Sequence, residues 1–165
     1  MAALTPFQTV GPYLHLGLRA GLSPMTSRDV SAPVVIQGRL VDGAGAGISD
    51  GVLEFWAAGF DGVGRVWTAA DGRYRLDAVM PLTRADSDGG IHAPHFAVRV
   101  LARGILTAYL TRVYFDGQAD NARDLVLQAV PAHRRATLVA ALRAPSEYHL
   151  DIVVQGERET VFFDV

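Results

Sequence analysis

The sequence APHFAVRVLARG at residues 93–104 predicts a β-strand from His95 to Leu101. A second strand, Tyr109–Phe115, follows after a short interval and is closed by the turn pair Asp116-Gly117. Upstream, the turn pair Asp71-Gly72 precedes a further strand at Arg73–Leu76. Short strands separated by turns are typical of an all-β fold.

The same pattern extends toward both ends of the chain. Val34–Val41 predicts a strand from its β-branched content, and Val52–Trp56 predicts another. A short piece at Leu125–Leu127 and two last strands, Tyr148–Val154 and Thr160–Phe163, complete the set. Strands at roughly even spacing predict a mainly β fold, namely a β-sandwich of short strands.

One short helix and an extended N-terminal arm complete the predicted fold. The helix is expected from Ala132 to Arg143, since Pro131 suits a first turn, apolar residues recur at helical spacing, and Pro145 prevents continuation. Residues 1–33 contain four of the eight prolines and are interpreted as an extended arm. The predicted organisation is therefore an arm over residues 1–33 and a β-sandwich domain over residues 34–165.

Composition limits the classes of function that the chain can have. A length of 165 residues suits one domain with a real core, and half of the residues are apolar. The 15 basic residues are all Arg, the net charge is −2, and no basic run occurs, so a nucleic-acid partner is not expected. The absence of cysteine excludes disulfides. With no signal-peptide pattern and no apolar run of membrane-spanning length, we expect a cytoplasmic protein with no membrane contact.

Two segments carry a resemblance to a known family. The N-terminal run TPFQTVGPY at Thr5–Tyr13 contains Gln-Thr-x-Gly-Pro-Tyr, and in the strand at residues 93–104 a His precedes an Arg-Gly pair by eight positions. In combination they resemble the intradiol ring-cleavage dioxygenases, and most closely the alpha-type chains of that family. Matches at Val52–Trp56, Thr111–Asp116 and Ile152–Asp164 extend the resemblance over most of the chain.

The resemblance implies ferric iron, yet most of the iron ligands of the family are missing here. Family members bind Fe(III) through two tyrosines and two histidines, the latter as His-x-His on one strand, where alternate residues face the same side. The equivalent of the second His is Ala97. The segments Ala57–Asp61 and Leu82–Ile91, which should supply the tyrosines, contain none, and His92 replaces an expected Arg. We therefore expect no metal ligand in this chain.

The remaining tyrosines and histidines allow two interpretations. Four tyrosines fall within predicted strands and are interpreted as core or interface aromatics: Tyr74, Tyr109, Tyr114 and Tyr148. His95 is interpreted as a core or interface histidine, because it lacks partners of metal-binding type and spacing. The alternative is a metal site unlike that of the family, formed by His15, His92 or His95 with a carboxylate such as Asp88.

The resemblance also implies substrate-binding residues in the arm. In the family, the arm of the alpha-type chain lines the active site carried by the beta-type chain, which corresponds here to Thr9, Gly11, Pro12 and Tyr13, with Arg103 near the same pocket. Gly-Pro gives a rigid turn that can pack against an aromatic ring. Tyr13 offers a hydroxyl, and Arg103 a permanent charge for an anionic aromatic acid. The alternatives are an interface anchor for Tyr13 and a salt bridge for Arg103.

The resemblance implies a subunit without catalytic residues of its own. A homologous beta-type chain would bind Fe(III), and the two chains would cleave protocatechuate, a small aromatic acid, with O2 to 3-carboxy-cis,cis-muconate. Such pairs would assemble into a higher hetero-oligomer. The alternatives are a non-enzymatic β-sandwich that serves as a binding or structural module, and the autonomous metalloenzyme described above.

Overall fold

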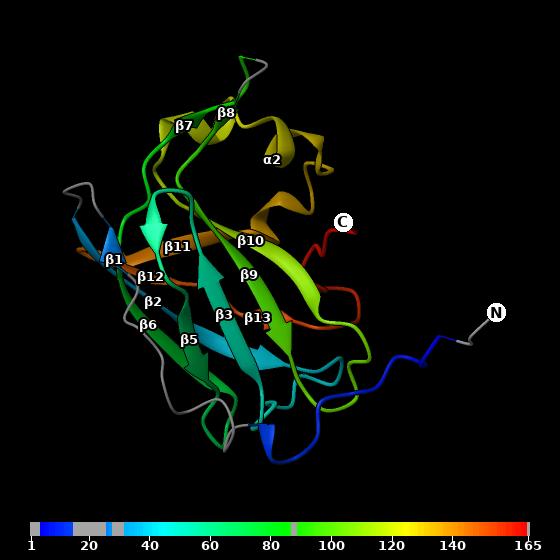
Figure 1. The fold of residues 1–165 in the computed structure, drawn as a ribbon. Helices are drawn as coiled ribbons and strands as arrows, with labels where there is room; N and C mark the ends of the chain where they lie inside the picture. Colours follow the sequence, from blue (N-terminus) through cyan, green and yellow to red (C-terminus); the bar gives the residue numbers. More distant parts are fainter. Residues whose placement is uncertain (1–3, 15–25, 28–31, 87–88, 165) are drawn as a thin grey trace.

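The computed structural model describes residues 4–14, 26–27, 32–86 and 89–164 (Figure 1). The strands are β1 (Thr26–Ser27), β2 (Pro33–Val41), β3 (Val52–Trp56), β4 (Phe60–Asp61), β5 (Gly64–Trp67), β6 (Arg73–Val79), β7 (Arg84–Ala85), β8 (Ile91–His92), β9 (His95–Leu101), β10 (Tyr109–Phe115), β11 (Val139–Ala144), β12 (Glu147–His149) and β13 (Ile152–Val153). The helical elements are the 3-10 helix η1 (Ala119–Ala122), the α-helix α2 (Leu125–Ala129) and the 3-10 helix η2 (Arg135–Thr137).

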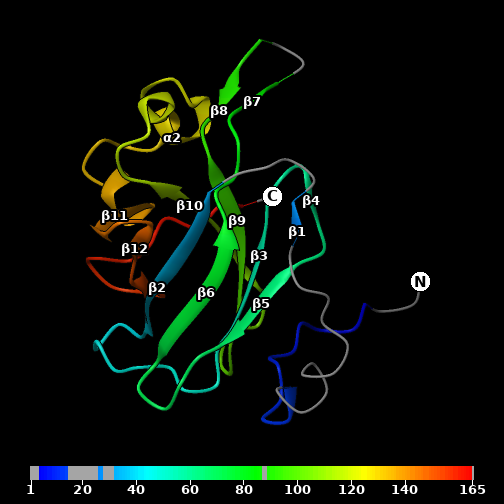
Figure 2. The same ribbon diagram turned by 90° about the vertical axis from the view of Figure 1, so that its left-hand side faces the viewer.

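Nine of these strands form one sheet that curls into two layers. Its order is β13-β2-β12-β11-β10-β9-β3-β5, and β6 pairs with β2. Most neighbours are antiparallel, whereas β2 runs parallel to β12 and β13, and β10 runs parallel to β11. Strands β5 and β6 contact each other, so the sheet is nearly closed (Figure 2). This arrangement confirms the predicted β-sandwich.

The core lies between the layers and is supplied by strand alternation. In β9, the alternate side chains at residues 96, 98 and 100 are buried, whereas those on the other face are partly or fully exposed. This follows from the opposite orientation of successive side chains on a strand. The ring of Phe96 meets the rings of Phe55, Phe60 and Phe115 edge to face. These contacts fix β9 at the centre of the molecule.

The predicted helix from Ala132 to Arg143 is wrong. Residues 139–144 form strand β11, which pairs in parallel with β10 through Tyr114 and Val139. Leu142, an apolar residue within the predicted helix, is half exposed. Tertiary pairing with a buried strand therefore outweighs the local helical pattern. The α-helix lies instead at Leu125–Ala129, where a short strand piece was expected.

The C-terminal prediction is also corrected in part. The expected strand Tyr148–Val154 divides into β12 and β13, and Thr160–Phe163 forms no strand. Thr160 bonds to Val153 through both its backbone and its hydroxyl, while the Phe163 N–H donates to Leu110 O at 2.7 Å. The segment is thus attached at single points rather than along a ladder.

Within the described ranges, no helix is long and apolar enough to cross a membrane.

The N-terminal arm and the helical elements lie toward opposite ends of the sandwich. In both ribbon views, β7, β8 and α2 gather at one end, whereas residues 4–14 pass the other (Figures 1 and 2). Strand β9 runs between these ends, with His95 at its start and Arg103 just beyond its last residue. At about 3.3 Å per strand residue, the two side chains are anchored roughly 25 Å apart.

Candidate functional site

The arm is attached to the sandwich through Thr9. Its hydroxyl accepts a hydrogen bond from the Gly104 N–H at 2.7 Å and donates one to Ala102 O at 3.3 Å. Gly104 has a φ of 87°, a conformation that favours glycine and turns the chain immediately after Arg103. The single side chain of Thr9 therefore holds the arm beside the turn that carries Arg103.

Pro12 and Arg103 line one cavity of about 300 Å³. The other lining residues are Ser49, Asp50, Gly51, Trp67 and Thr68. Arg103 forms an ion pair through Nε with Asp50 Oδ2. The side chain of Arg103 is 59% exposed and that of Asp50 is 24% exposed, so the guanidinium keeps an open side. The structure thus brings together Thr9, Pro12 and Arg103, three of the five residues predicted to bind substrate.

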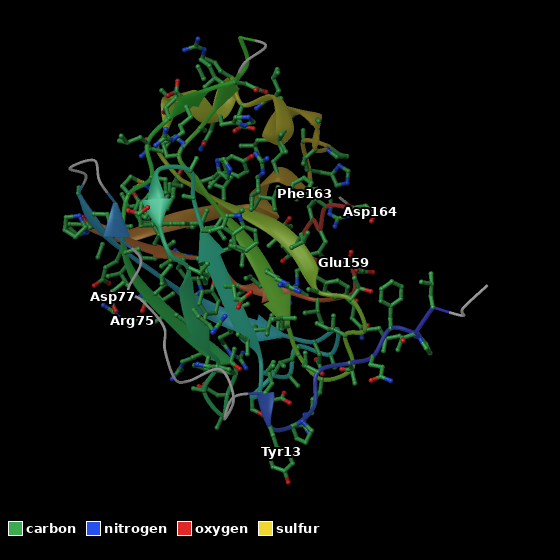
Figure 3. The ribbon with its side chains drawn as sticks, in the orientation of Figure 1. Tyr13, Arg75, Asp77, Glu159, Phe163 and Asp164 are labelled. Carbon is green, nitrogen blue, oxygen red and sulfur yellow. The ribbon has the colours of Figure 1, made fainter. Side chains whose placement is uncertain are left out.

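The other two predicted residues lie on the open side of the arm. Tyr13 is 73% exposed and extends away from the sheet (Figure 3). It does not line the cavity of Pro12 and Arg103. Gly11 is exposed, and a Cβ built there would meet nothing within 4 Å. In this chain, therefore, neither Tyr13 nor Gly11 is held by packing.

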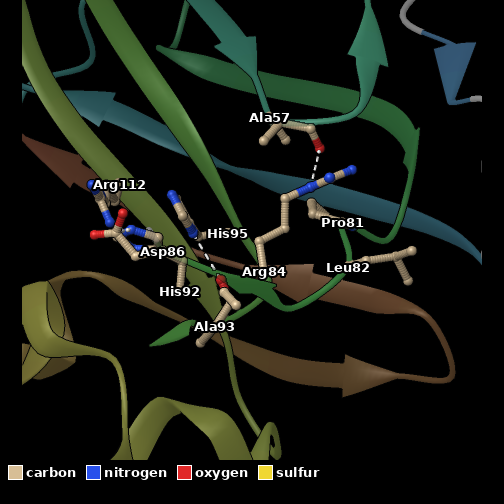
Figure 4. A pocket seen from close by; sticks show the side chains of 11 residues that line it. Ala57, Pro81, Leu82, Arg84, Asp86, His92, Ala93, His95 and Arg112 are labelled. Carbon is tan, nitrogen blue, oxygen red and sulfur yellow. Dashed lines mark hydrogen bonds and ion pairs between the residues drawn. The ribbon is translucent and has the colours of Figure 1, made fainter. Parts of the chain in front are cut away.

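A second cavity, of about 320 Å³, lies at the opposite end of β9, around His95 (Figure 4). Its charged and polar side chains come from strands β7, β8, β9 and β10 and from the residue after β7, and most of its apolar ones come from the loops after β3 and β6. The lining residues are Ala57, Ala58, Pro81, Leu82, Arg84, Ala85, Asp86, His92, Ala93, His95 and Arg112. This cavity contains the His that the sequence aligns with the first histidine ligand of the family.

His95 is held by a backbone carbonyl and lies beside two tilted rings. Its Nδ1 lies 2.7 Å from Ala93 O, and because a carbonyl only accepts, Nδ1 carries the proton. The ring lies 5.2 Å from the Tyr114 ring and 6.0 Å from the His92 ring, centroid to centroid. Burial lowers the pKa of His95, and the charge of Arg112 acts in the same direction. At neutral pH His95 is therefore a neutral imidazole.

Beneath this cavity, the buried carboxylate of Asp124 joins β10, α2 and the residue that follows β8. It accepts hydrogen bonds from the Ala93 N–H at 2.9 Å, the Leu127 N–H at 2.8 Å and the Tyr114 hydroxyl at 3.1 Å. The bond from Leu127 caps the N-terminus of α2. The Tyr114 hydroxyl in turn accepts from Arg112 Nη1 at 3.2 Å. Burial raises the pKa of Tyr114 well above its usual range, so the phenol stays neutral.

The side chains around this cavity do not form a ligand set for ferric iron. Hard Fe(III) favours anionic oxygen ligands, whereas the Tyr114 hydroxyl is engaged with both Asp124 and Arg112 and Tyr114 is not among the residues lining the cavity. Two guanidinium groups, Arg84 and Arg112, line the same cavity. No group of three or more His, Cys, Asp or Glu in the described part of the chain is arranged to hold a metal. His92 Nε2 lies 3.7 Å from Asp86 Oδ2, while His15 and Asp88, named in the alternative metal site, fall outside the described residues.

The tyrosines within strands are mostly core residues. Tyr74, Tyr114 and Tyr148 are buried, and the Tyr74 hydroxyl donates to Leu150 O at 2.6 Å. Tyr109 is partly exposed and stacks against Phe162 with centroids 4.7 Å apart. The interpretation of these tyrosines as core aromatics is confirmed for the three buried ones.

Sequence reasoning missed Asp50, Arg112 and Asp124. Asp50 stands in a turn beside Gly51, and its contact with Arg103 spans 53 residues of chain. Asp124 directly precedes α2, so a correctly placed helix would have predicted it as an N-terminal cap. Arg112 carries no local signal, since it is one of several arginines on strands. Tertiary structure alone places it between Tyr114 and the cavity.

Similarity to known proteins covers almost the whole chain. The sequence is 40% identical to the protocatechuate 3,4-dioxygenase alpha chain of Burkholderia cepacia, with 98% of this chain and 97% of the relative covered. It is 35% identical to the protein of the same name from Pseudomonas putida, with 97% and 96% covered. No protein-family model matches the chain.

Solved structures show the same fold at lower identity. The dioxygenase domain of a dioxygenase–carbohydrate-binding fusion protein from Streptomyces sp. SirexAA-E superposes with a TM-score of 0.61 at 24% identity, covering 92% of this chain and 98% of that one. A 3-chlorocatechol 1,2-dioxygenase from Rhodococcus opacus 1CP gives a TM-score of 0.61 at 20% identity, covering 79% and 61%.

Proposed function

The chain belongs to the family of protocatechuate 3,4-dioxygenase alpha chains, and we propose that it is the iron-free subunit of such an enzyme. The observation that carries this proposal is the identity of 40% across nearly the full length of both chains. In the proposed reaction, the ring bond between the two hydroxylated carbons of protocatechuate breaks. Both atoms of O2 enter the product, 3-carboxy-cis,cis-muconate.

In this proposal the iron belongs to a homologous beta chain. The cavity around His95 does not suit Fe(III), because no tyrosine is among its described lining residues and two guanidinium groups are. The beta chain would hold Fe(III) through two tyrosines and two histidines, and the iron would bind the catechol oxygens of the substrate. The present chain would supply part of the substrate pocket and no catalytic residue.

The arm and Arg103 are the parts proposed to face the beta chain. Leu4, Phe7 and Tyr13 are 95%, 77% and 73% exposed, an unusual density of apolar surface for a segment of eleven residues. Such side chains are expected to be covered by a partner. Thr9 would fix the base of the arm, Gly11 and Pro12 would approach the substrate ring, and Tyr13 would reach the shared pocket.

Arg103 is proposed to attract the substrate carboxylate. Its guanidinium is held by Asp50 through Nε, and it remains more than half exposed. The terminal nitrogens can therefore donate to a carboxylate presented by the partner's pocket. Such pairs of chains would assemble into a larger hetero-oligomer, in which residues 1–33 form the contacting arm and residues 34–165 the sandwich domain.

A pull-down tests this proposal. A tag at the C-terminus leaves the N-terminal arm free, and the eluate from the native host is examined by mass spectrometry, iron analysis and visible absorption. We expect a second chain of similar size, about one iron per pair, and an absorption band from phenolate-to-iron charge transfer. A variant lacking residues 1–14 should recover less of the partner. A colourless eluate with a single chain would favour a non-enzymatic β-sandwich module instead.

A further inference from the structure

Arg112 is a half-buried guanidinium with no carboxylate of its own. It lines the cavity around His95, and its Nη1 donates to the Tyr114 hydroxyl at 3.2 Å. Asp124 is linked to it through that hydroxyl, and the oxygens of Asp124 already accept from two backbone N–H groups. Among the described residues, no carboxylate lies within ion-pair distance of Arg112. A guanidinium has five N–H donors, so most of those on Arg112 remain available to an anion.

His95 offers a complementary group in the same cavity. Since its Nδ1 is committed to Ala93 O, its other nitrogen, Nε2, carries a lone pair when the ring is neutral. Burial lowers the pKa of His95, which keeps it in that form near pH 7. Nε2 has no hydrogen-bond partner among the described residues. The cavity therefore combines a donor cation with a neutral acceptor, and Figure 4 shows both side chains at its wall.

The rest of the cavity suits a small and largely apolar body. Six of its lining residues are short or apolar: Ala57, Ala58, Pro81, Leu82, Ala85 and Ala93. Its volume of about 320 Å³ lies at the lower end of the range for small-molecule sites. A second guanidinium, Arg84, is oriented by a bond from Nε to Ala58 O at 3.1 Å. One carboxylate, Asp86, also lines the cavity and lies beside His92, with Oδ2 3.7 Å from His92 Nε2.

We propose that this cavity binds a small aromatic monocarboxylate that carries a ring hydroxyl. The carboxylate would accept from Arg112, the hydroxyl would donate to His95 Nε2, and the ring would rest on the alanine, proline and leucine side chains. The site lies at the opposite end of β9 from Arg103 and goes beyond the proposed function. It requires neither iron nor the arm.

Binding of 4-hydroxybenzoate, measured by titration calorimetry, tests the proposal. The full-length chain is used, together with any partner chain that it carries, in an Arg103→Gln background that weakens the pocket proposed at the arm. We expect Arg112→Gln to weaken binding by about tenfold or more, because a charge-assisted hydrogen bond is lost. The matched control, Arg143→Gln, changes an exposed arginine of β11 and should bind as the background does.

Two further comparisons keep the test decisive. Arg112→Lys preserves the charge and should bind with intermediate affinity. If thermal unfolding shows that Arg112→Gln does not fold, Arg112→Lys is used in its place, with Arg143→Lys as the control. Benzoate, which lacks the hydroxyl, should bind more weakly than 4-hydroxybenzoate, and His95→Phe should remove that difference. The proposal is overturned if Arg112 variants bind as tightly as their Arg143 controls, or if Arg103→Gln alone abolishes all binding. If the proposal holds, Arg103→Gln by itself leaves the binding of 4-hydroxybenzoate that depends on Arg112 intact.

Discussion

Arg103 and Asp50 form an ion pair between Nε and Oδ2 on the wall of the cavity that Pro12 also lines. The pair leaves the outer side of the guanidinium exposed while it fixes the inner side. Asp50 therefore acts on Arg103 in two opposing ways. It orients the guanidinium, and it offsets part of the positive charge that would attract a carboxylate.

Replacement of Asp50 by Asn should separate these effects. Because the amide can still accept a hydrogen bond while the negative charge is gone, we expect the KM of the assembled enzyme for protocatechuate to fall by about 1.5- to fivefold. The kcat should change little. Asp77→Asn, at the exposed Arg75–Asp77 pair of β6, is the matched control (Figure 3). A KM that rises, or that equals the control, would contradict the electrostatic role of Asp50.

Thr9 should determine how firmly the arm is held. Thr9→Val removes the bonds to Ala102 O and Gly104 N, each worth about 0.5–1.5 kcal/mol. We expect limited chymotrypsin digestion to cleave at Phe7 or Tyr13 about tenfold faster than in the wild type. Thr9→Ser keeps the hydroxyl and should be cleaved at close to the wild-type rate. Equal cleavage of all three proteins would mean that this hydroxyl does not hold the arm.

Asp124 should be essential for stability. Asp124→Ala leaves the Ala93 N–H, the Leu127 N–H and the Tyr114 hydroxyl without their acceptor, and we expect a loss of about 3–5 kcal/mol in the free energy of unfolding. Asp124→Asn retains one acceptor oxygen and should lose less. Urea denaturation measures both, with the exposed Asp116→Ala as control. A loss no larger than that of Asp116→Ala would contradict the proposed network.

His95 should make stability depend on pH. Burial lowers the pKa of His95 in the folded chain, whereas in the unfolded chain the pKa of a histidine is about 6.5. Between these two values the unfolded state binds more protons, so the free energy of unfolding should fall as the pH drops below about 6.5. His95→Asn should show a shallower decline, measured by urea denaturation at a series of pH values. Identical slopes in the two proteins would show that His95 does not contribute.

Much of the fold could be predicted because burial alternates along the strands. The strands expected at Val34–Val41, Val52–Trp56, His95–Leu101 and Tyr109–Phe115 all lie within the observed strands. The helix expected at Ala132–Arg143 failed because residues 139–144 find a parallel partner in β10, which no local pattern records. A parallel pairing joins distant segments, so its stabilisation is invisible in a short window of sequence.

The candidate site was predictable only in part. The family resemblance led to Thr9, Pro12 and Arg103, and the structure brings these three together. The family resemblance could not indicate Asp50, whose role depends on a contact with a residue 53 positions away in the sequence. Nor could it indicate Arg112, which differs from other strand arginines through its position beside a neutral phenol and a cavity.

We propose that Arg103 supplies a carboxylate-binding group to an active site on the partner chain. The most direct test compares the KM of the assembled enzyme for protocatechuate and for catechol, which lacks the carboxylate, in wild type and Arg103→Gln. We expect the KM for protocatechuate to rise by about tenfold or more, since a charge-assisted hydrogen bond is lost, while the KM for catechol stays nearly constant. Equal changes for both substrates, or none for either, would contradict this role of Arg103.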